Sequence, residues 1–268
     1  MNEKYFDVSN DIVIITGISG QLGYEYAITF LKQGSVVVGI DIKEPKNIKK
    51  LQNSKHKFKF IHCDVTNKSN LKDALNQTIN TVGVPTVLIN NAGIDSPPSS
   101  SDKENGPFEN YPESSWDNVL NVNLKGVFLC CQTFGSVMAE NKQGSIINIS
   151  SIYGLVSPDQ KLYEYRRKND ETFYKPIAYS ASKSGIFNLT RYLAVYWAKE
   201  NVRVNTLTIA GVFNNQDSSF LQSYCERIPI GRMANPDDYF GPILFLASRS
   251  SQYVTGHNLI ADGGWTSI

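Results

Sequence analysis

Short apolar runs rich in valine and isoleucine alternate along this chain with longer segments whose apolar residues recur at helical spacing. Strands that are apolar on both faces and separated by helices indicate a parallel sheet covered on both sides. The sequence therefore predicts a doubly wound α/β fold of the Rossmann type, with ligands beyond the carboxyl ends of the strands. Seven strands are expected, at residues 12–16, 36–40, 58–62, 86–90, 145–150, 203–208 and 258–261. Helices are expected at residues 22–32, 71–82, 116–139, 179–199 and 236–247.

A length of 268 residues allows one large domain or two small ones. No linker-like boundary divides the chain, so residues 1–268 are expected to form a single domain. Three polar stretches interrupt the alternation, at residues 95–114, 154–177 and 213–232. Each follows the end of an expected strand, and each should therefore project over the ligand-binding edge of the sheet.

Composition excludes several classes of protein. The 26 basic residues nearly balance the 25 acidic ones, which disfavours a nucleic-acid or membrane-surface protein. No apolar run approaches the roughly 18 residues of a membrane-spanning helix. The N-terminus lacks the apolar core of a signal peptide.

The cysteines and histidines carry no metal or disulfide pattern. The four cysteines form no C-x-x-C pair, which favours reduced, buried thiols in a protein of the cytoplasm. The three histidines are scattered along the chain, so no metal site is expected.

A glycine-rich loop connects the first expected strand to the first expected helix, with Gln21 and Leu22 before its last glycine. Gly17 permits a tight turn out of the strand, and Gly20 lets backbone amides approach a pyrophosphate. Gly23 lets the helix pack closely on the sheet. The N–H groups at the helix N-terminus favour phosphate. In this position the loop predicts a dinucleotide cofactor.

The residue that distinguishes NAD from NADP is expected to be Asp41, which lies 18 positions after Gly23 at the end of the second strand. A carboxylate there accepts hydrogen bonds from the ribose hydroxyls of the adenosine and repels a 2′-phosphate. No arginine or lysine stands between Ile18 and Leu22 to attract that phosphate, and Lys43 is the nearest cation. The sequence therefore favours NAD as the cofactor.

Tyr179 and Lys183 are four residues apart at the start of an expected helix, so they lie on one helical face. A neighbouring ammonium group favours the phenolate and is expected to lower the pKa of the tyrosine toward the range of proton transfer. The same spacing also occurs on ordinary solvated helix faces, so the pair needs further context.

That context is a series of motifs in a fixed order, through which the chain resembles the short-chain dehydrogenase/reductase family over essentially its whole length. The matching segments are Thr16–Gly23, Asp64-Val65, Asn90–Gly93, Asn123 in Asn-Val-Asn-Leu-Lys-Gly, Ser150-Ser151, Tyr179-x-x-x-Lys183, Val254–Gly256 and Asp262–Gly264. Each motif alone is weak, but the ordered set is specific.

The resemblance implies a mechanism. Tyr179 would be the general acid/base, and Ser151 rather than Ser150 would hydrogen-bond the substrate oxygen. Lys183 would bind the ribose of the nicotinamide, and Asn123 would hold a water that links Lys183 to solvent. The resemblance also implies cofactor contacts beyond the glycine loop and Asp41, at Asp64, Val65, Asn91, Ala92, Gly93, Tyr179, Lys183, Gly211 and Val212.

The chain departs from the family pattern at three places. Gln21 stands where short members usually have glycine, a spacing that resembles the larger nucleotide-sugar-modifying members. Ala210 precedes Gly211 where the family usually has proline. Ser151 and Tyr179 are 28 positions apart, more than is usual, and the additional residues form the stretch 154–177.

The stretch 154–177 contains several aromatic residues and the basic run Arg166–Lys168. It is expected either to cover the substrate, with its cations facing an anionic group, or to form a subunit contact. Chains with such an insert resemble members from carbohydrate and surface-polysaccharide metabolism, which suggests a sugar, sugar acid or sugar phosphate as substrate. Two alternatives stay open, namely a nucleotide-sugar epimerase or dehydratase that retains NAD, and a non-catalytic NAD-binding protein. The resemblance also implies a homodimer or homotetramer that pairs through residues 116–139 and 179–199.

Overall fold

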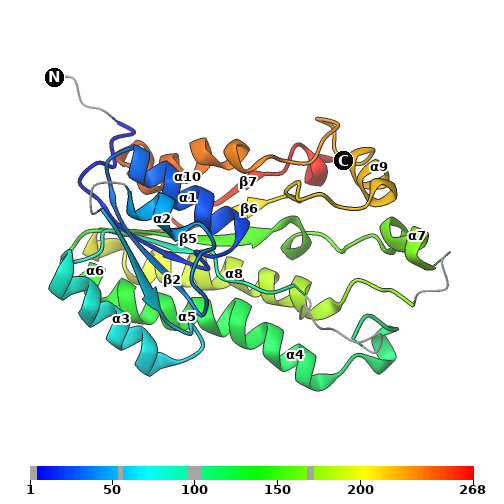
Figure 1. The fold of residues 1–268 in the computed structure, drawn as a ribbon, viewed down its shortest axis with the longest axis horizontal. Helices are drawn as coiled ribbons and strands as arrows, with labels where there is room; N and C mark the ends of the chain where they lie inside the picture. Colours follow the sequence, from blue (N-terminus) through cyan, green and yellow to red (C-terminus); the bar gives the residue numbers. More distant parts are fainter. Residues whose placement is uncertain (1–4, 54–56, 96–103, 168–171) are drawn as a thin grey trace.

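The computed structural model describes residues 5–53, 57–95, 104–167 and 172–268 of the chain. It contains a seven-stranded parallel sheet with the strand order β3-β2-β1-β4-β5-β6-β7 (Figure 1). The strands are β1 (Ile12–Thr16), β2 (Val36–Asp41), β3 (Phe58–His62), β4 (Val87–Asn90), β5 (Gly144–Ser151), β6 (Val202–Ile209) and β7 (Asn258–Ala261). The predicted doubly wound fold is confirmed.

The strand order reverses between β1 and β4, which are paired in parallel with Ile15 opposite Ile89. The connections that leave these two strands turn to opposite faces of the sheet and open a crevice at its carboxyl edge. Ligands of doubly wound sheets bind at such a reversal. The glycine loop after β1 and the segment after β4 therefore lie at the expected binding edge.

Helices cover both faces of the sheet (Figure 1). One face is covered by α1 (Gln21–Lys32), α2 (Ile48–Gln52) and α10 (Phe240–Ala247). The other is covered by α3 (Lys68–Thr81), α8 (Ile177–Tyr196) and a long helical segment that includes α4 (Glu113–Leu120), α5 (Gly126–Cys130) and α6 (Ser136–Glu140). Alternate strand residues point to opposite cores. Ile14 joins the α3/α8 core, whereas Val13 and Ile15 join the α1/α10 core, so the strand must be apolar on both faces.

The long helical segment expected at 116–139 extends from Glu113 to Glu140, with two π-helical turns at Asn121–Lys125 and Cys131–Gly135. Such wide turns within α-helices occur frequently at functional sites. The first contains Asn123, whose side chain is fully buried.

The second and third polar stretches contain short helices that the sequence pattern did not indicate. They are η5 (Gln160–Tyr163) and α7 (Glu164–Arg167) in the stretch 154–177, and α9 (Ser218–Cys225) in the stretch 213–232. Figure 1 shows α7 and α9 at the same end of the molecule. The short helices η5 and α9 contribute to a third apolar cluster, which contains Tyr153, Tyr163 and Tyr224. The expected basic residue Lys168 and most of the stretch 95–103 lie outside the described residues.

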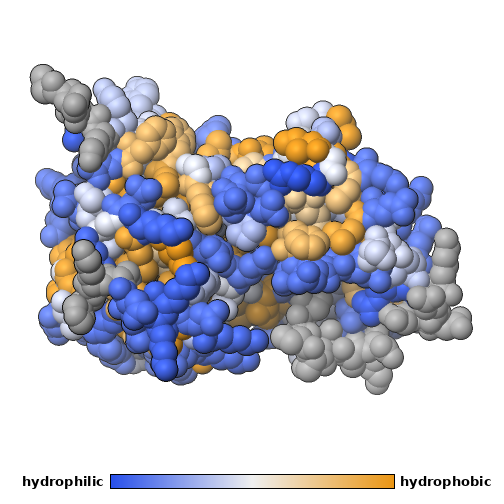
Figure 2. All heavy atoms as spheres, turned by 45° about the horizontal axis from the view of Figure 1, so that its top comes forward, coloured by the Kyte–Doolittle hydropathy of each residue, from blue (hydrophilic) through white to orange (hydrophobic). Residues whose placement is uncertain are grey.

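The surface is mixed in character. On the face that Figure 2 shows, hydrophilic residues are interrupted by several separate hydrophobic patches, as on ordinary globular proteins. No helix within the described part of the chain has both the length and the apolar character needed to cross a bilayer.

Candidate active site

The glycine loop has the tight geometry that its sequence predicts. Gly17 has a φ of +69°, and a Cβ there would lie 2.7 Å from Cα of Ala92. A Cβ on Gly23 would lie 2.2 Å from the carbonyl oxygen of Gly17. At Gly20 the nearest atom would be 3.4 Å away, so packing within the chain does not require glycine at that position. A bare backbone at Gly20 instead leaves room for a ligand to approach.

The N-terminus of α1 is suited to an anion. Gly20 is its N-cap, and no described side chain caps this end of the helix. The first amides of the helix, at Gln21, Leu22 and Gly23, therefore lack the partner that a capping side chain normally supplies. The side chain of Leu22 packs into the α1/α10 core. These residues fit the pyrophosphate of a dinucleotide, which would be bound by the backbone.

The segment after β4, at Asn91 and Ala92, is hydrogen-bonded to the glycine loop and stabilises it. The side-chain amide of Asn91 donates to the carbonyl oxygens of Thr16 and Gly17, both at 3.2 Å. The backbone amides of Asn91 and Ala92 donate to the Thr16 hydroxyl at 3.1 and 3.0 Å. Asn91 and Ala92 thus hold the loop in position. Gly93 lies at the site itself, since a Cβ there would be 3.4 Å from Nζ of Lys183.

Asp41 lies at the end of β2 and faces the glycine loop. Its carboxylate accepts hydrogen bonds from the backbone amides of Ser19 at 2.9 Å and Lys43 at 3.2 Å. Asp64 accepts from the amide and hydroxyl of Thr66 at 2.8 and 2.7 Å and so shapes the turn after β3. Val65 is buried and packs against Gly126. The structure thus brings Asp41 to the loop, and places Asp64 in a local turn.

Ser151 and Tyr179 line one cavity of about 480 Å³ beyond the carboxyl ends of β5 and β6. Ser151 ends β5, and Tyr179 lies in the first turns of α8. The hydroxyl of Ser150 instead donates to the backbone carbonyl of Lys183 at 3.0 Å, outside the cavity lining. Gly211 and Val212 also line the cavity.

Gly211 is fixed by its neighbours. Its amide donates to the hydroxyl of Tyr224 at 2.8 Å, and a Cβ there would lie 2.7 Å from the Met233 side chain. Val212 forms a parallel bridge with Ala234. The turn therefore keeps its glycine although proline does not precede it.

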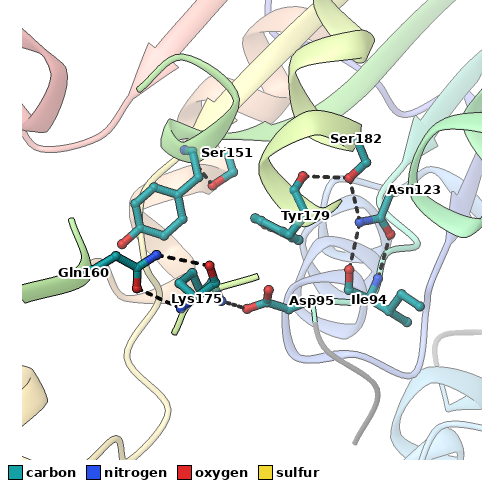
Figure 3. Close-up of polar contacts among 9 residues, drawn as sticks. Ile94, Asp95, Asn123, Ser151, Gln160, Lys175, Tyr179 and Ser182 are labelled. Atoms are coloured by element: carbon teal, nitrogen blue, oxygen red, sulfur yellow. Dashed lines mark hydrogen bonds and ion pairs between the residues drawn. The ribbon is translucent and has the colours of Figure 1, made fainter. Parts of the chain in front are cut away.

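Lys183 and Asn123 lie in a buried hydrogen-bonded region behind Tyr179. Nζ of Lys183 donates to the carbonyl oxygen of Ile149 at 3.0 Å and lies 5.8 Å from the centre of the Tyr179 ring. The amide of Asn123 donates to the Ile94 carbonyl at 2.7 Å and to the Ser182 hydroxyl at 3.1 Å, and its Oδ1 accepts from the Ile94 amide at 2.8 Å (Figure 3). Because both Nδ2 protons of this side chain bind the protein, a water held by Asn123 would have to donate to its Oδ1 or bind its backbone.

The expected effect of Lys183 on Tyr179 is wrong for this structure. Burial, followed by the negative charge of Asp95, raises the pKa of Tyr179, and the neighbouring Ser151 hydroxyl opposes this rise only in part. Burial also lowers the pKa of Lys183 to about 8, while Asp95 acts in the opposite direction. Desolvation disfavours the charged form of both groups, and the charge that acts on Tyr179 is Asp95 and not Lys183.

Sequence reasoning missed Asp95 and Lys175, which line the cavity with Tyr179, and Gln160, which holds Lys175 in place. Lys175 forms an ion pair with Asp95, and Figure 3 shows the two side chains pointing toward each other. Nζ of Lys175 lies 5.4 Å from the centre of the Tyr179 ring. Gln160 holds Lys175 by its backbone, accepting from its amide at 2.9 Å and donating to its carbonyl at 3.2 Å. The only sequence signal was position, since Asp95 follows the Asn90–Gly93 motif and Lys175 precedes Tyr179 by four positions.

The two described residues of the basic run, Arg166 and Arg167, do not form the substrate-facing cover that was one of the two expectations from the sequence. The guanidinium of Arg167 donates to the carbonyl oxygens of Phe173 at 2.8 Å and Gln160 at 2.7 Å. That of Arg166 lies over the Phe173 ring at 4.1 Å. Both arginines thus contact the insert itself, and neither lines the cavity.

Neither a metal-binding cluster nor a cysteine belongs to the cavity of Ser151 and Tyr179 among the described residues. Across the described segments, no three His, Cys, Asp or Glu side chains gather in an arrangement that could hold a metal ion. The four cysteines are free thiols, of which Cys63, Cys130 and Cys131 are buried and Cys225 is half-buried.

Comparison with known proteins places this fold and site in one class of enzymes. A family model described as enoyl-(acyl carrier protein) reductase matches residues 17–266. The 2-dehydro-3-deoxy-D-gluconate 5-dehydrogenase of Dickeya dadantii is 31% identical, and the match covers 97% of each chain. The 5-keto-D-gluconate 5-reductase of Escherichia coli is 29% identical over 97% of this chain and 96% of its own.

Solved structures agree with that class. A short-chain dehydrogenase from Leptospira borgpetersenii with bound NAD⁺ has a TM-score of 0.86 and 35% identity, over 99% of this chain and 96% of its own. A gluconate 5-dehydrogenase from Burkholderia cenocepacia in complex with NADP and tartrate has a TM-score of 0.85 and 25% identity, over 98% of each chain.

The chain belongs to the short-chain dehydrogenase/reductase family. It is an oxidoreductase that interconverts secondary alcohols and ketones with a nicotinamide cofactor. Because these relatives are dehydrogenases and reductases, the epimerase and non-catalytic alternatives lose their support.

Proposed function

We infer that this enzyme uses NAD to interconvert a secondary alcohol and a ketone on a sugar acid. The observation that carries the proposal is the cavity in which Ser151 and Tyr179 lie together, bounded by Gly211 and Val212. It supplies two hydroxyl groups for one substrate oxygen at the ligand-binding edge of the sheet. The names of the two sugar-acid relatives support the substrate class.

Preference for NAD is supported by Asp41. Its carboxylate is fixed by the backbone amide of Ser19 in the glycine loop and by that of Lys43 after β2, and it lies where the adenosine ribose of a dinucleotide is expected. A 2′-phosphate would meet this negative charge. The uncapped N-terminus of α1 suits the pyrophosphate of either cofactor and does not discriminate between them. Bound NAD supplies the hydride acceptor, or in the reduced form the donor.

The protein's own groups would handle the proton and the substrate oxygen. Tyr179 would transfer the proton through its hydroxyl, and Ser151 would hold the oxygen by a hydrogen bond. Lys183 would bind the ribose next to the nicotinamide, for which its buried ammonium is positioned behind Tyr179. Because burial and then the negative charge of Asp95 raise the pKa of Tyr179, efficient proton removal needs a further positive group near the hydroxyl.

A spectrophotometric screen tests the function. The enzyme would be assayed with NADH against keto sugar acids, matched ketoses and keto sugar phosphates, and with NAD⁺ against the corresponding alcohols. We expect the highest kcat/KM for a sugar acid. Turnover confined to neutral polyols or phosphate esters would reject the substrate class while leaving the dehydrogenase assignment intact.

We further infer that the protein is a cytoplasmic homodimer or homotetramer. Free cysteines support a reducing compartment. Exposed apolar side chains on the paired helices, at Phe128, Tyr192, Val195 and Tyr196, support association through these helices. Sedimentation of the wild type and of Val195→Glu tests the interface, because a buried charge would dissociate the oligomer.

A further inference from the structure

We propose that Lys175 binds the carboxylate of the substrate and thereby determines the preference of the enzyme for an acid over a neutral sugar. This inference rests on the proposed function, since it requires a sugar-acid substrate. It adds a specific group to that function and assigns a role to the insert at residues 154–177.

The first argument is the position of the charge. Among the described residues that line the cavity of Ser151 and Tyr179, Lys175 is the single cation. Its ammonium lies 5.4 Å from the centre of the Tyr179 ring. A substrate whose reacting oxygen meets the Tyr179 hydroxyl can therefore place a carboxylate at Lys175 a few carbon–carbon bonds away.

The second argument is that the cation is fixed. The Lys175 side chain is only 11% exposed, which is unusual for a lysine. Gln160 holds the Lys175 backbone from both its amide and its carbonyl (Figure 3). Arg167 in turn holds the Gln160 carbonyl. The binding group is thus positioned before the substrate arrives, which reduces the entropy lost on binding.

The third argument is that the present partner of Lys175 can be replaced. Asp95 is 47% exposed, so the ion pair joins a buried cation to a carboxylate that faces water. A nearly buried ammonium needs a negative partner, because an unpaired charge in such a place is costly. A substrate carboxylate that enters the cavity meets that need in place of Asp95, or together with it, and Asp95 can return to water at little cost.

The charge balance favours a carboxylate over a phosphate. One lysine offers a single compact charge, and Asp95 and Asp217 also line the cavity. A phosphate carries more negative charge and would meet both carboxylates with one cation to offset them. A monoanionic acid is the better match.

The experiment compares 5-keto-D-gluconate with the ketose that has a hydroxymethyl group in place of its carboxylate, both reduced with NADH. We expect the wild type to prefer the acid. In Lys175→Met the ratio of kcat/KM for acid to that for ketose should fall by about 10- to 100-fold, the usual worth of a hydrogen bond to a charged group. The loss should appear in the KM of the acid. Lys175→Arg, which keeps the charge, should retain most of the preference.

Two further variants separate binding from mere structure. Asp95→Asn removes the competing carboxylate, so the KM of the acid should fall or stay constant, opposite to Lys175→Met. Lys161→Met, at an exposed lysine of the same insert, should leave both substrates unaffected. Raising the salt concentration should increase the acid's KM in the wild type more than in Lys175→Met, because salt screens the charge pair.

The outcomes distinguish a failure of the proposed sugar-acid substrate from a failure of the role given to Lys175. A wild type that prefers the ketose, or a phosphate ester, overturns the proposed substrate class and this inference with it. A wild type that prefers the acid, with Lys175→Met keeping that preference or losing both substrates equally, overturns the role of Lys175 alone.

Discussion

The side-chain amide of Gln21 donates a 2.9 Å hydrogen bond to the backbone carbonyl of Phe213, which joins two segments 192 positions apart. Gln21 belongs to the glycine loop at the start of α1, and Phe213 begins the stretch that leads to α9. The residue that replaces the family's usual glycine therefore connects the expected phosphate site to a wall of the substrate cavity.

Gln21→Ala removes this connection. We expect backbone amides of residues 213–217 to exchange about 2- to 10-fold faster with solvent, the equivalent of one partly exposed hydrogen bond. Hydrogen-exchange mass spectrometry measures this directly. Gln33→Ala, at an exposed glutamine at the other end of α1, is the control. Equal exchange in all three proteins would show that the bond does not hold the loop.

Asp41→Asn should narrow the preference for NADH over NADPH. The change removes the charge that faces a 2′-phosphate and weakens the acceptor for the ribose hydroxyls, so the ratio of the two dissociation constants should shift by about 10-fold or more. Fluorescence titration of the reduced cofactors measures both constants. Glu44→Gln removes an exposed carboxylate nearby and should not change the ratio. Equal affinity of the unaltered protein for both cofactors would reject the role of Asp41.

Much of the fold was predictable because its signals are local. Each strand is a short apolar run, and residues such as Val13 and Ile14 are buried on opposite faces, so periodicity and burial agree. The glycine loop was equally predictable from the sequence. The structure has no space for a side chain at Gly17 or Gly23, so glycine at these positions marks the tight turn. These features depend on neighbours in the sequence and on one strand–helix unit.

The missed parts of the site depend on contacts between distant segments. Lys175 and Asp95 are 80 positions apart, and no motif relates them. Burial caused the error about Tyr179, because spacing on a helix shows that Lys183 is near but not how much water both groups lose. The short helix α9 was hidden by polar residues, although its N-cap Asp217 was available as a signal.

Lys183 should make stability depend on pH. Its pKa is lowered from 10.5 to about 8 on folding, so between these values the unfolded chain binds more protons and the free energy of unfolding rises with pH. In the Lys183→Met variant this contribution to the rise of the free energy of unfolding with pH is absent. The free energy of unfolding of the wild type minus that of Lys183→Met should therefore increase by roughly 1–2 kcal/mol from pH 8 to pH 9.5. Urea unfolding without cofactor measures it, with the exposed Lys199→Met as control. A pH-independent difference would mean that the lysine is not desolvated.

Tyr179→Phe removes the transferable proton and keeps the ring. We expect kcat to fall by roughly two to four orders of magnitude, the usual contribution of a general acid or base. Affinity for NADH, measured by fluorescence, should be preserved, whereas Lys183→Met should weaken both cofactor binding and turnover. Tyr192→Phe, at an exposed tyrosine of the same helix, serves as the control. Near-normal turnover of the true substrate by Tyr179→Phe would assign the proton transfer to another group.

Arg167→Ala tests whether the insert serves substrate binding. Arg167 holds the carbonyl oxygens of Phe173 and Gln160, and Gln160 fixes the backbone of Lys175. Loss of the guanidinium should loosen this arrangement and raise the substrate KM by about 5- to 50-fold, since two hydrogen bonds from a charged donor are lost. NADH affinity should be unchanged, because the bonds of Gln21 and Asp41 go to Phe213, Ser19 and Lys43, which all lie outside the insert. Lys161→Ala is the matched control. Arg167→Lys should raise the substrate KM less than Arg167→Ala does, because lysine keeps the positive charge but lacks the two parallel donors of a guanidinium.

Steady-state kinetics paired with sedimentation separates the two roles considered for this segment, namely substrate binding and subunit contact. An unchanged KM together with a shifted oligomeric state would show that the insert is a subunit contact and does not position Lys175.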